Sequence, residues 1–453
     1  MQNFDLIVIG AGSGLNVASA ASEKGLKVAI VEKGPMGGTC LNRGCIPSKI
    51  IIHSADISEI ITRAKSFGLN SGNISVNFKK IIKRATNIID KEAGEIEKGL
   101  SENNNVAIFK KEAKFIGDRS LRVGNITIKG KKIVIAAGTR PSIPEIEGLK
   151  DVDFITSDEA LRLEKQPKSL TILGGGYISA ELAHFFGSLG TKINIIQKGK
   201  FLIPNEDGEI SSAFTNIFRR KYNVLVEHNT TKISKRDRKF IVVAEVKKRK
   251  RILISDQLLV ATGRTPNTDI LNVEKTNVDV GEKGFIKTNQ YLETTAKNIW
   301  ALGDIVGKFL FKHSANLEAE CVYNNAILKK RIRVDYGAMP HAIFSSPQVA
   351  GVGLREQDLI NQKINFAVGR YRFINSGMGL AMQDYDGFIK IFAERKTKKI
   401  LGCHILGSQA PTLIHEVVLA MKSGLTTWSI QNTTHIHPAL SEVVQRAINS
   451  IEW

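Results

Sequence analysis

The chain has 453 residues, of which 42% are hydrophobic, and its formal net charge is +20. This length and composition suffice for two to four packed domains of ordinary globular type. No run of about 18 uncharged apolar residues occurs, which excludes a membrane-spanning helix, and we expect no membrane partner. Residues 4–9 begin a strand almost at once and leave no room for a signal peptide, so we expect a cytoplasmic protein.

A glycine-rich turn follows the first predicted strand. The apolar residues 6–9 lead into three glycines, Gly10, Gly12 and Gly14. An alanine-rich helix and a second apolar strand at 28–31 come next, and that strand ends on Glu32. This order is typical of a dinucleotide-binding unit, in which glycines let the backbone approach a pyrophosphate and the acid accepts a ribose hydroxyl. The third glycine of the pattern falls at Leu15, so close packing of helix and strand must be arranged differently, with Gly14 as the candidate.

Two of the four cysteines, Cys40 and Cys45, lie five positions apart in the segment 37–49. An extended chain would hold their Cα atoms roughly 16 Å apart, whereas a disulfide needs about 4.4–6.8 Å. Bonding therefore requires the chain to fold back, which Gly44 permits. Pro47 suits the first turn of a helix and would place Cys45 at a helix N-terminus, where a thiolate is favoured. The spacing indicates a redox pair, with two reduced buried cysteines or a metal clip as alternatives.

A second unit of the same kind recurs about 165 residues later. The strand at 170–173 precedes the glycines Gly174 and Gly176, and Ser179 takes the third glycine position. The next strand spans 192–196. Two such units, on either side of a predicted domain boundary near 141–144, imply two dinucleotides bound at once and hence a hydride relay.

The residues after this last strand bear on the choice of nicotinamide nucleotide. NAD-selective sites place an acid there to hold the ribose 2′-OH, whereas NADP-selective sites offer cations to the 2′-phosphate. The chain has Gln197, Lys198 and Lys200 at these positions. The missing acid and the two cations favour NADPH or dual use, although the general basicity of the chain would give the same lysines.

Two basic runs, at 235–239 and 247–251, flank the apolar stretch 240–244. This pattern is typical of the solvated ends of a β-hairpin. The net charge can attract nucleic acid non-specifically, but no aromatic residues interleave the charges as a stacking platform requires. We therefore expect no dedicated nucleic-acid site, and we expect no metal site.

A histidine and an acid near the C-terminus supply chemistry that a dithiol needs. A thiol reacts as its thiolate and needs a base with a pKa near neutrality, which His437 provides. Glu442, five residues on, can fix the imidazole tautomer and stabilise its charged form. We expect His435 to be a supporting or packing residue. The two lone cysteines are expected to be small buried hydrophobes: Cys321 and Cys403.

The chain resembles the flavin-dependent pyridine nucleotide-disulfide oxidoreductases over essentially its whole length. A redox cysteine pair between two dinucleotide-binding units is their arrangement, and four segments carry the likeness: 37–49, 260–267, 299–304 and 435–442. The first and last look like the redox and active-site base segments of dihydrolipoamide dehydrogenases, with Ala439 where a threonine is common. Segment 260–267 looks like the family's motif at the point where the chain leaves the nucleotide domain, and segment 299–304 looks like its second flavin motif.

This resemblance implies an α/β fold with two Rossmann-like, three-layer dinucleotide-binding domains and a C-terminal α+β dimerisation domain. It places FAD binding in residues 1–145 and 268–336, NAD(P) binding in 146–267 and the dimer interface in 337–453. The implied cofactors are FAD and either NAD or NADP, and the implied assembly is a homodimer.

The resemblance also implies catalytic roles. Cys45 would face the flavin as the charge-transfer thiolate, and Cys40 would exchange with the substrate. His437 of the other subunit would be the general base, and Glu442 would orient its imidazole.

Further positions are implied for the cofactors. Lys49 would lie by the flavin N5 edge and pair with Glu181. Asp304 would hold the ribityl chain, and Glu32 would hold the adenosine ribose. The remaining implied cofactor-binding positions are Gly10, Gly12, Gly14, Lys33, Gly38, Thr39, Ala137, Gly138, Gly174, Gly176, Tyr177, Ile178, Gln197, Lys198, Gly263, Arg264, Gly303 and Ala315.

Absent features narrow the choice within the family. No cysteine follows Cys403, which argues against mercuric reductases and large thioredoxin reductases, and the complete cysteine pair argues against soluble transhydrogenases. The leading expectation is dihydrolipoyl dehydrogenase, acting on a lipoyl group or small dithiol, with a 2-oxoacid dehydrogenase complex as a candidate partner. Segments 10–14, 382–384, 401–407 and 437–440 also look like mycothione reductases, so an NADPH-dependent reductase of another small disulfide is the alternative. A flavoprotein acting mainly as a binding component is the alternative from a different class.

Overall fold

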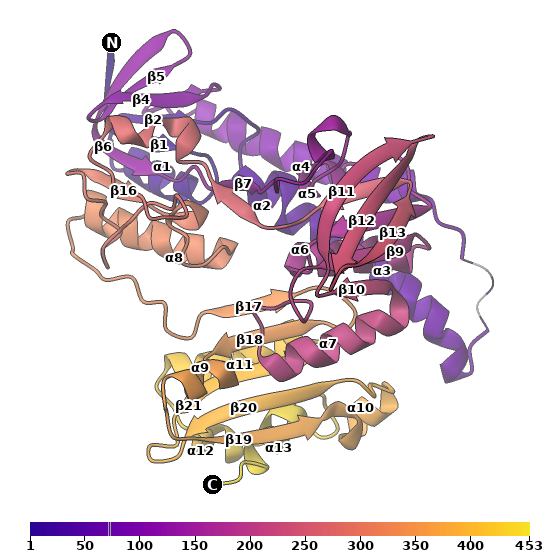
Figure 1. The fold of residues 1–453 in the computed structure, drawn as a ribbon. Coiled ribbons are helices and arrows are strands. Elements are labelled where there is room, and N and C mark those ends of the chain that lie inside the picture. The colour runs from indigo at the N-terminus through magenta and orange to yellow at the C-terminus, as the bar shows by residue number, and fades with distance from the viewer. Residues whose placement is uncertain (71, 73) are drawn as a thin grey trace.

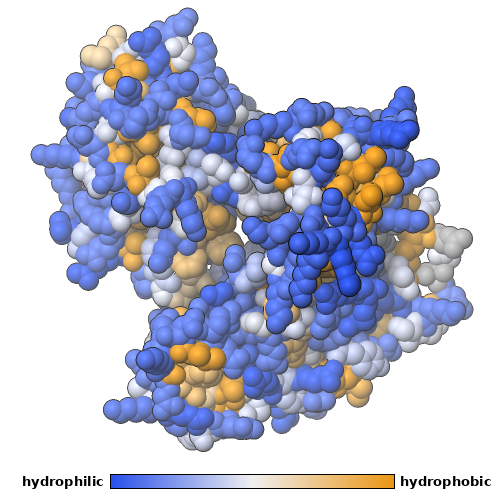
Figure 2. All heavy atoms as spheres, in the orientation of Figure 1, coloured by the Kyte–Doolittle hydropathy of each residue, from blue (hydrophilic) through white to orange (hydrophobic). Residues whose placement is uncertain are grey.

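In the computed structural model, which describes residues 1–70, 72 and 74–453, the chain forms three regions (Figure 1). The chain leaves the first region, builds the second, returns to the first and ends in the third. Hydrophilic side chains predominate on the face shown in Figure 2, and apolar residues form separate patches among them. None of the helices among the described residues is long and apolar enough to cross a membrane.

The first region is built on a seven-stranded sheet whose order is β3-β2-β1-β6-β5-β4, with β16 also paired to β6. Its central strands are parallel, and the C-terminal ends of β1 and β6 are apolar and buried because the sheet is covered there. The strands are β1 (Gln2–Ile9), β2 (Val28–Val31), β3 (Val106–Phe109), β4 (Ala113–Gly117), β5 (Ser120–Val123), β6 (Ile126–Ile135) and β16 (Ile299–Ala301). Since β16 comes from a later part of the chain, this sheet is complete only after the chain has returned.

Helices of the first region cover the sheet and carry the cysteine pair. Helix α1 (Gly14–Glu23) packs on the sheet together with α8 (Lys312–Val322), which lies far away in sequence (Figure 1). The others are α2 (Gly38–Arg43), α3 (Cys45–Arg63) and α4 (Phe78–Ser101).

The second region has a four-stranded parallel sheet of order β10-β9-β8-β14, covered by helices on one side and by the antiparallel sheet β11-β12-β13 on the other. As the charge pattern predicted, the two basic runs form the turns at either end of β12. The elements are α5 (Ser157–Ala160), β8 (Ser169–Leu173), α6 (Tyr177–Ser188), β9 (Lys192–Gln197), α7 (Gly208–Lys221), β10 (Asn223–Val226), β11 (Asn229–Arg236), β12 (Lys239–Val246), β13 (Arg249–Ser255) and β14 (Gln257–Val260).

Two short strands connect the first two regions, and a five-stranded antiparallel sheet forms the third. Strand β7 (Thr139–Pro141) enters the second region and pairs with β15 (Arg264–Pro266), which leaves it. The third sheet has the order β17-β18-β21-β20-β19. Its elements are β17 (Pro340–Ile343), β18 (Val349–Gly353), α9 (Glu356–Asn361), β19 (Phe366–Arg372), α10 (Gly377–Ala381), β20 (Phe388–Glu394), β21 (Ile400–Leu406), α11 (Ala410–Lys422), α12 (Thr427–Gln431) and α13 (Glu442–Asn449).

Both lone cysteines are buried, as predicted. Cys321 lies in α8 and is 5% exposed, and Cys403 lies in β21 and is 0% exposed. Burial raises the pKa of both thiols, to about 11 at Cys321. These two thiols are therefore protonated and unreactive at neutral pH.

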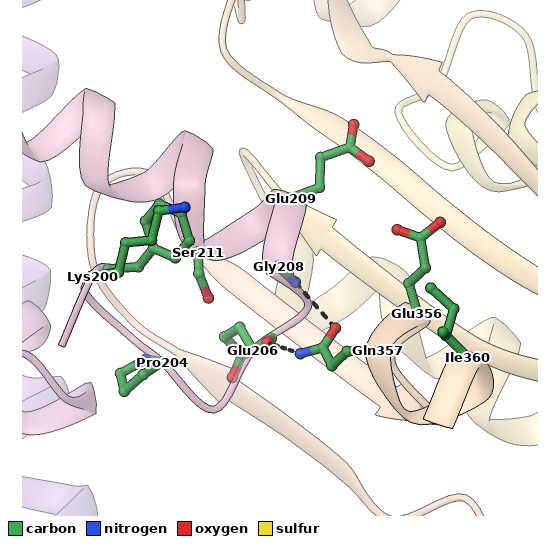
Figure 3. Close-up of a pocket in the computed structure, with 10 residues that line it drawn as sticks. Lys200, Pro204, Glu206, Gly208, Glu209, Ser211, Glu356, Gln357 and Ile360 are labelled. Atoms are coloured by element: carbon green, nitrogen blue, oxygen red, sulfur yellow. Dashed lines mark hydrogen bonds between the residues drawn. The ribbon is translucent and has the colours of Figure 1, made fainter. Parts of the chain in front are cut away.

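A buried ion cluster joins the second and third regions. The Lys390 ammonium in β20 is fully buried and contacts the buried carboxylate of Asp207 at 3.0 Å. Glu356 at 2.8 Å and Glu209 at 3.0 Å complete its partners. The Lys390 ammonium thus neutralises acids at the N-terminal end of α7 and at the start of α9, among them Glu209 and Glu356 (Figure 3).

Lys390→Met is expected to destabilise the protein by about 3 kcal/mol, because removing one partner leaves the buried charge of Asp207 without its cation. Urea unfolding followed by circular dichroism measures the effect. Lys150→Met is the matched control, since its ion pair with Glu145 is exposed and its loss should cost less than about 1 kcal/mol. Equal midpoints for the two variants would contradict a structural role for the buried cluster.

Candidate active site

A cavity of about 510 Å³ lies where the three regions meet. Its wall combines the first glycine turn, the cysteine pair, the start of α6 and the segment that leads into α8. The predicted site residues that line it are Gly10, Gly12, Glu32, Lys33, Gly38, Thr39, Cys40, Cys45, Lys49, Ala137, Gly138, Tyr177, Ile178, Glu181, Arg264, Gly303, Asp304 and Ala315. The predicted residues outside it are Gly14, Gly174, Gly176, Gln197, Lys198, Gly263, His437 and Glu442.

The first glycine turn lies against neighbouring backbone with no room for side chains. Gly10 has φ +101°, and a Cβ there would lie 2.3 Å from the Ala136 carbonyl oxygen. A Cβ at Gly14 would lie 2.8 Å from Val8 Cγ1, so this glycine provides the close helix-strand contact that Leu15 cannot. The chain therefore departs from the usual glycine pattern by one position, because Gly14 and not residue 15 makes the close contact between helix and strand.

Glu32 closes this turn from the end of β2. Its carboxylate accepts the backbone N–H of Ala11 at 2.9 Å and that of Gly34 at 2.8 Å. The neighbouring Lys33 forms an exposed ion pair with Glu112 at 2.8 Å. The acid is thus held at the rim of the cavity beside the turn.

Cys40 and Cys45 are brought together by a tight connection between two helices. Cys40 lies in α2, α3 begins at Cys45, and Gly44 lies between them. A Cβ on Gly44 would lie 3.0 Å from the Thr39 carbonyl oxygen, so the chain folds back at this residue. Both cysteines are free thiols, which corresponds to the reduced form of a redox pair.

The two thiols have opposite acidities. A hydrogen bond from Cys40 is the main stabiliser of the Cys45 thiolate, and Lys49 adds to it, so the pKa of Cys45 falls to about 7 although burial opposes this. The same hydrogen bond and burial raise the pKa of Cys40 well above its usual value. As the pH rises above about 7, the reduced pair therefore keeps its proton on Cys40 and carries its negative charge on Cys45.

Lys49 and Glu181 form the predicted ion pair beneath the cysteines. The Lys49 ammonium in α3 lies 2.8 Å from the Glu181 carboxylate in α6. The backbone N–H of Phe344 also donates to Glu181 at 3.0 Å, and the Lys49 ammonium lies 4.5 Å from the centre of the Phe344 ring. Lys49 is thus fixed between all three regions and beside Cys45.

Asp304 also lines the cavity, next to residues of the connecting strands. Its carboxylate accepts the Thr139 hydroxyl at 3.0 Å, and Arg264 donates to the same hydroxyl at 2.6 Å. Burial raises the pKa of Asp304. A buried acid with free acceptor capacity facing a cavity is suited to a ligand that carries hydroxyl groups.

The second glycine turn repeats the geometry of the first. Gly174 has φ +103°, and a Cβ there would lie 2.3 Å from the Ala261 carbonyl oxygen. After β9, the Gln197 side chain packs on Gly175 and donates to the Phe201 carbonyl at 3.2 Å, whereas Lys198 is exposed. No carboxylate follows β9 at positions 197–200. The uncharged and basic side chains that favoured NADPH or dual use in the sequence therefore stand at the end of this strand.

His437 and Glu442 pair at the surface of the third region. His437 Nδ1 lies 3.0 Å from Glu442, and the Ala439 N–H donates to the same carboxylate at 3.1 Å. These hydrogen bonds lower the pKa of Glu442. The His437 side chain is 74% exposed and lies outside the cavity of its own chain. His435 is largely buried and bound to Glu416 at 2.9 Å, as expected for a packing residue.

Comparison with known proteins decides the family. A model of the pyridine nucleotide-disulphide oxidoreductases matches residues 4–342, and a model of the dimerisation domain of the same family matches residues 339–448. The chain belongs to this family. The predicted family, fold class and enzyme class are confirmed, and the family implies FAD and a nicotinamide nucleotide as cofactors.

Relatives with three different activities match nearly the whole chain. Dihydrolipoyl dehydrogenase of Bacillus subtilis (strain 168) is 33% identical over 98% of this chain and 95% of its own length. Mycothione reductase of Mycobacterium tuberculosis is 34% identical over 99% of both chains. Mercuric reductase of Staphylococcus aureus is 32% identical over 94% of this chain and 78% of its own length. These matches show that the chain is a disulfide oxidoreductase. Because the relatives act on different substrates, the matches do not identify the substrate of this chain.

Among solved structures, the HOCl-induced flavoprotein disulfide reductase RclA of Escherichia coli has the same fold. Its Cu(II) complex superposes with a TM-score of 0.89, at 27% identity, over 99% of both chains. Among the described residues of the present chain, no group of three or more His, Cys, Asp or Glu side chains could hold a metal ion.

The cavity fits the FAD that the family implies. Gly12 and Gly38 face each other at the start of α1, and a Cβ on Gly38 would lie 2.6 Å from the Gly12 Cα. This side-chain-free approach to a helix N-terminus suits a pyrophosphate. Asp304 offers an acceptor for ribityl hydroxyls, and Lys49 offers a cation near the cysteines. These residues would hold the cofactor.

Lys312 is a site residue that the sequence reasoning missed. It begins α8, lines the cavity and donates to the Ser13 hydroxyl at 2.9 Å. Its charge favours the thiolate form of Cys40, just as Lys49 favours that of Cys45. A signal was available: a lysine in the first turn of a helix opposes the helix dipole and needs another reason to be there.

Lys312→Met is expected to raise the pKa of the thiol pair by about 0.5–1 unit, because a nearby cation that favours the anion is lost. The pH dependence of iodoacetamide alkylation of the reduced protein measures this shift toward higher pH. Lys308→Met serves as the control, since this exposed lysine lies over the Tyr336 ring at 6.0 Å. Superimposable profiles for wild type and both variants would show that Lys312 does not act on the thiols.

Proposed function

We propose that the protein is a dihydrolipoyl dehydrogenase, which oxidises dihydrolipoamide to lipoamide with NAD+. The observation that carries this proposal is geometric: two free thiols, Cys40 in α2 and Cys45 at the start of α3, lie together at the wall of a cavity that fits FAD. The pKa of Cys45 is lowered and that of Cys40 is raised, which agrees with separate roles. Such a pair is suited to exchange with a dithiol at one sulfur while the other sulfur is held against the cofactor.

In the proposed reaction, His437 of the partner subunit takes a proton from one thiol of the substrate. The resulting thiolate attacks Cys40 Sγ of the Cys40–Cys45 disulfide, and the Cys45 thiolate leaves. The second substrate thiol then loses its proton to solvent, attacks the substrate sulfur of the mixed disulfide and expels Cys40, which takes the first proton from the imidazolium. Glu442 stabilises that imidazolium through its 3.0 Å contact with Nδ1. The substrate is oxidised to its disulfide and the cysteine pair is reduced to the dithiol.

When bound, FAD supplies the two-electron transfer between the cysteine pair and the nicotinamide nucleotide. The chain's own contribution is to keep the Cys45 thiolate charged, through the Cys40 hydrogen bond and the Lys49 cation. Lys49 in turn is held in place by Glu181.

We infer that the active unit is a homodimer, because one chain does not place its histidine at its own cavity. The matched dimerisation domain supports this, and so do the large exposed side chains near His437, with Ile436 78% and Trp428 67% exposed. We also propose the division implied by the resemblance, with FAD in 1–145 and 268–336, NAD(P) in 146–267 and the interface in 337–453. A lipoyl group within a 2-oxoacid dehydrogenase complex is the proposed macromolecular partner.

A second candidate is an NADPH-dependent reductase of another small disulfide. It is favoured by the absence of an acid after β9, where Gln197 and Lys198 stand. The match to mycothione reductase over 99% of both chains also supports it. In this direction the same steps run in reverse, and Cys40 attacks the substrate disulfide.

A kinetic matrix of lipoamide and several small thiol disulfides against both nicotinamide nucleotides tests the proposal. We expect lipoamide with the NAD couple to give the highest kcat/KM. Lipoamide with NAD as the poorest pairing would contradict the leading proposal. A protein that carries FAD and turns over none of these pairs at several pH values would favour a mainly binding role.

A further inference from the structure

Glu318 is a buried acid in the middle of α8, the helix that begins with Lys312. Its side chain is 0% exposed, although acids are rarely fully buried unless they are paired. Within the described part of the chain no cation acts on its charge, and Asp304 adds a second negative charge nearby. Hydrogen-bond donors without charge must therefore hold this carboxylate.

Both oxygens of the Glu318 carboxylate accept a hydrogen bond. The backbone N–H of Gly303 donates to one oxygen at 2.5 Å, and the Tyr336 hydroxyl donates to the other at 2.7 Å. Burial, together with the Glu318 charge, raises the pKa of Tyr336, so the phenol keeps its proton and remains a donor. The carboxylate therefore links two segments that flank α8 in the sequence.

The contact with Gly303 fixes the segment that presents Asp304 to the cavity. Gly303 begins the short helix Gly303–Val306, so its N–H has no partner within that helix. Its φ is +78°, and a Cβ there would lie 3.5 Å from the Ala315 Cβ of α8. Gly303 and Asp304 both line the cavity, whereas Glu318 does not. The position of the Asp304 carboxylate therefore depends on an acid behind the cavity wall.

The contact with Tyr336 anchors the chain on its way to the third region. Tyr336 lies in the connection that leads into β17. Its ring centre is 5.5 Å from that of Phe309, and the Lys308 ammonium lies 6.0 Å from it. Both of these residues belong to the segment between Asp304 and α8. One carboxylate thus joins the second flavin motif and the connection to the third region to the same helix.

We propose that Glu318 is a positioning residue for FAD, whose charged carboxylate holds Gly303 and Asp304 where Asp304 can accept a ribityl hydroxyl. Because Glu318 does not line the cavity, it acts through these two residues and does not touch the cofactor. This inference rests on the proposed function only in taking FAD as the occupant of the cavity. A failure of lipoamide with NAD in the kinetic matrix would therefore contradict the leading substrate and not the role of Glu318.

The strength of this hold depends on the charge of Glu318. Burial raises its pKa to about 7, against the two hydrogen bonds, which lower it. Hydrogen bonds to a charged acceptor are roughly twice as strong as those to a neutral one, so protonation weakens the contact with Gly303. The charge is present above about pH 7 and is lost as the pH falls through that value. FAD should therefore leave faster on the acidic side.

The titratable and charged groups around Glu318 come from its own helix and from the two segments that it binds: Asp304, Lys308, Cys321 and Tyr336. Cys321 and Tyr336 stay protonated near neutral pH, because burial raises the pKa of both. Burial also raises the pKa of Asp304, so substitution has to assign the pH dependence. Cys45 has a pKa of about 7 but does not titrate in the oxidised enzyme, where its sulfur is in the disulfide.

Glu318→Gln keeps an acceptor for Gly303 and removes the charge. Release of FAD from the oxidised holoenzyme, followed by the fluorescence of free flavin after dilution, measures the effect. We expect wild-type release to quicken on the order of 10-fold between about pH 8.5 and about pH 6.5. Glu318→Gln should show the acidic rate of wild type at both pH values. Glu318→Ala, which has no acceptor, should be faster by a further factor on the order of 10.

Tyr336→Phe keeps the ring and removes the second donor. The Tyr336 hydrogen bond lowers the pKa of Glu318, so its loss should move the step in FAD release toward higher pH by about 1 unit. A purely packing role would leave the step where it is, because the ring contact with Phe309 remains. This variant and Glu318→Gln decide the proposal if Glu318→Ala does not fold.

Glu320→Gln is the matched control, because this exposed acid lies two positions further along the same helix. Its release rates should equal those of wild type. The role of Glu318 is overturned if Glu318→Gln keeps the pH step or releases FAD no faster than wild type at the alkaline pH. An unmoved step in Tyr336→Phe would also overturn it. A wild type that bound no FAD at all would overturn the proposed function, and the role of Glu318 with it.

Discussion

Cys40→Ser is expected to retain bound FAD, to lose turnover by about 10³-fold or more, and to show a permanent long-wavelength charge-transfer band. Turnover is lost because no second sulfur remains to exchange with the substrate. The band arises because Cys45 can no longer form a disulfide and remains a thiolate. In the reduced wild-type pair the pKa of Cys45 is about 7. Steady-state assays and a visible spectrum of the purified variant measure both effects.

The pH dependence of that band follows from the direction of the pKa shift. The Cys45 thiolate is present above its pKa and is lost as the pH falls through it. The Cys40 hydrogen bond is the largest cause of the lowered pKa of Cys45, and a serine hydroxyl still donates, so we expect the band to titrate near or somewhat above pH 7. Cys321→Ala is the control, because this buried thiol should leave band and turnover unchanged. A variant without a band at any pH would reverse or remove the assigned thiol roles.

His437→Ala is expected to slow the dithiol-disulfide half-reaction by about 10²–10⁴-fold, the usual contribution of a general base. The histidine holds the proton that substrate and Cys40 exchange, and its exposed ring with Nδ1 bound to Glu442 leaves Nε2 free to act across a dimer interface. Stopped-flow mixing with dihydrolipoamide measures this half-reaction. Reduction of the flavin by the nicotinamide nucleotide, which needs no such base, should change little.

His435→Gln provides the comparison for this histidine. Its ring is bound to Glu416 inside the third region, so any loss should be below about 10-fold. Similar losses in the two variants would assign the effect to local packing. A mixed dimer of His437→Ala and Cys40→Ser chains should regain one active site of two if the histidine acts across the interface, and no activity at all if it acts within its own chain.

The parts of the site that sequence predicts are those whose chemistry is local. The glycine turn at Gly10, the cysteines five residues apart and the pair His437 and Glu442 each lie within a short segment. Once the local turn forms, the members of each group lie within reach of one another, as the fold-back at Gly44 shows for the cysteines.

Residues that act through long-range contacts could not be predicted in this way. Lys312 reaches the cysteines only because α8 returns to the first sheet, and Glu318 meets Gly303 because the same helix packs against the segment that begins there. Each is an ordinary surface-type residue in sequence. The nicotinamide preference is open for a related reason: Gln197 is bound to the Phe201 carbonyl, and only contact with the nucleotide distinguishes the two ribose forms.

In the proposed mechanism Cys40 exchanges with the substrate and Cys45 faces the flavin. This division is tested most directly by alkylating the reduced holoenzyme with one equivalent of iodoacetamide and locating the label by peptide mass spectrometry. The proposed roles predict that the label is on Cys40 although its pKa is raised, because the partner's His437 can take its proton and the bound flavin covers the Cys45 thiolate. The long-wavelength band of the Cys45 thiolate should persist. A label on Cys45 with loss of the band would contradict the assignment.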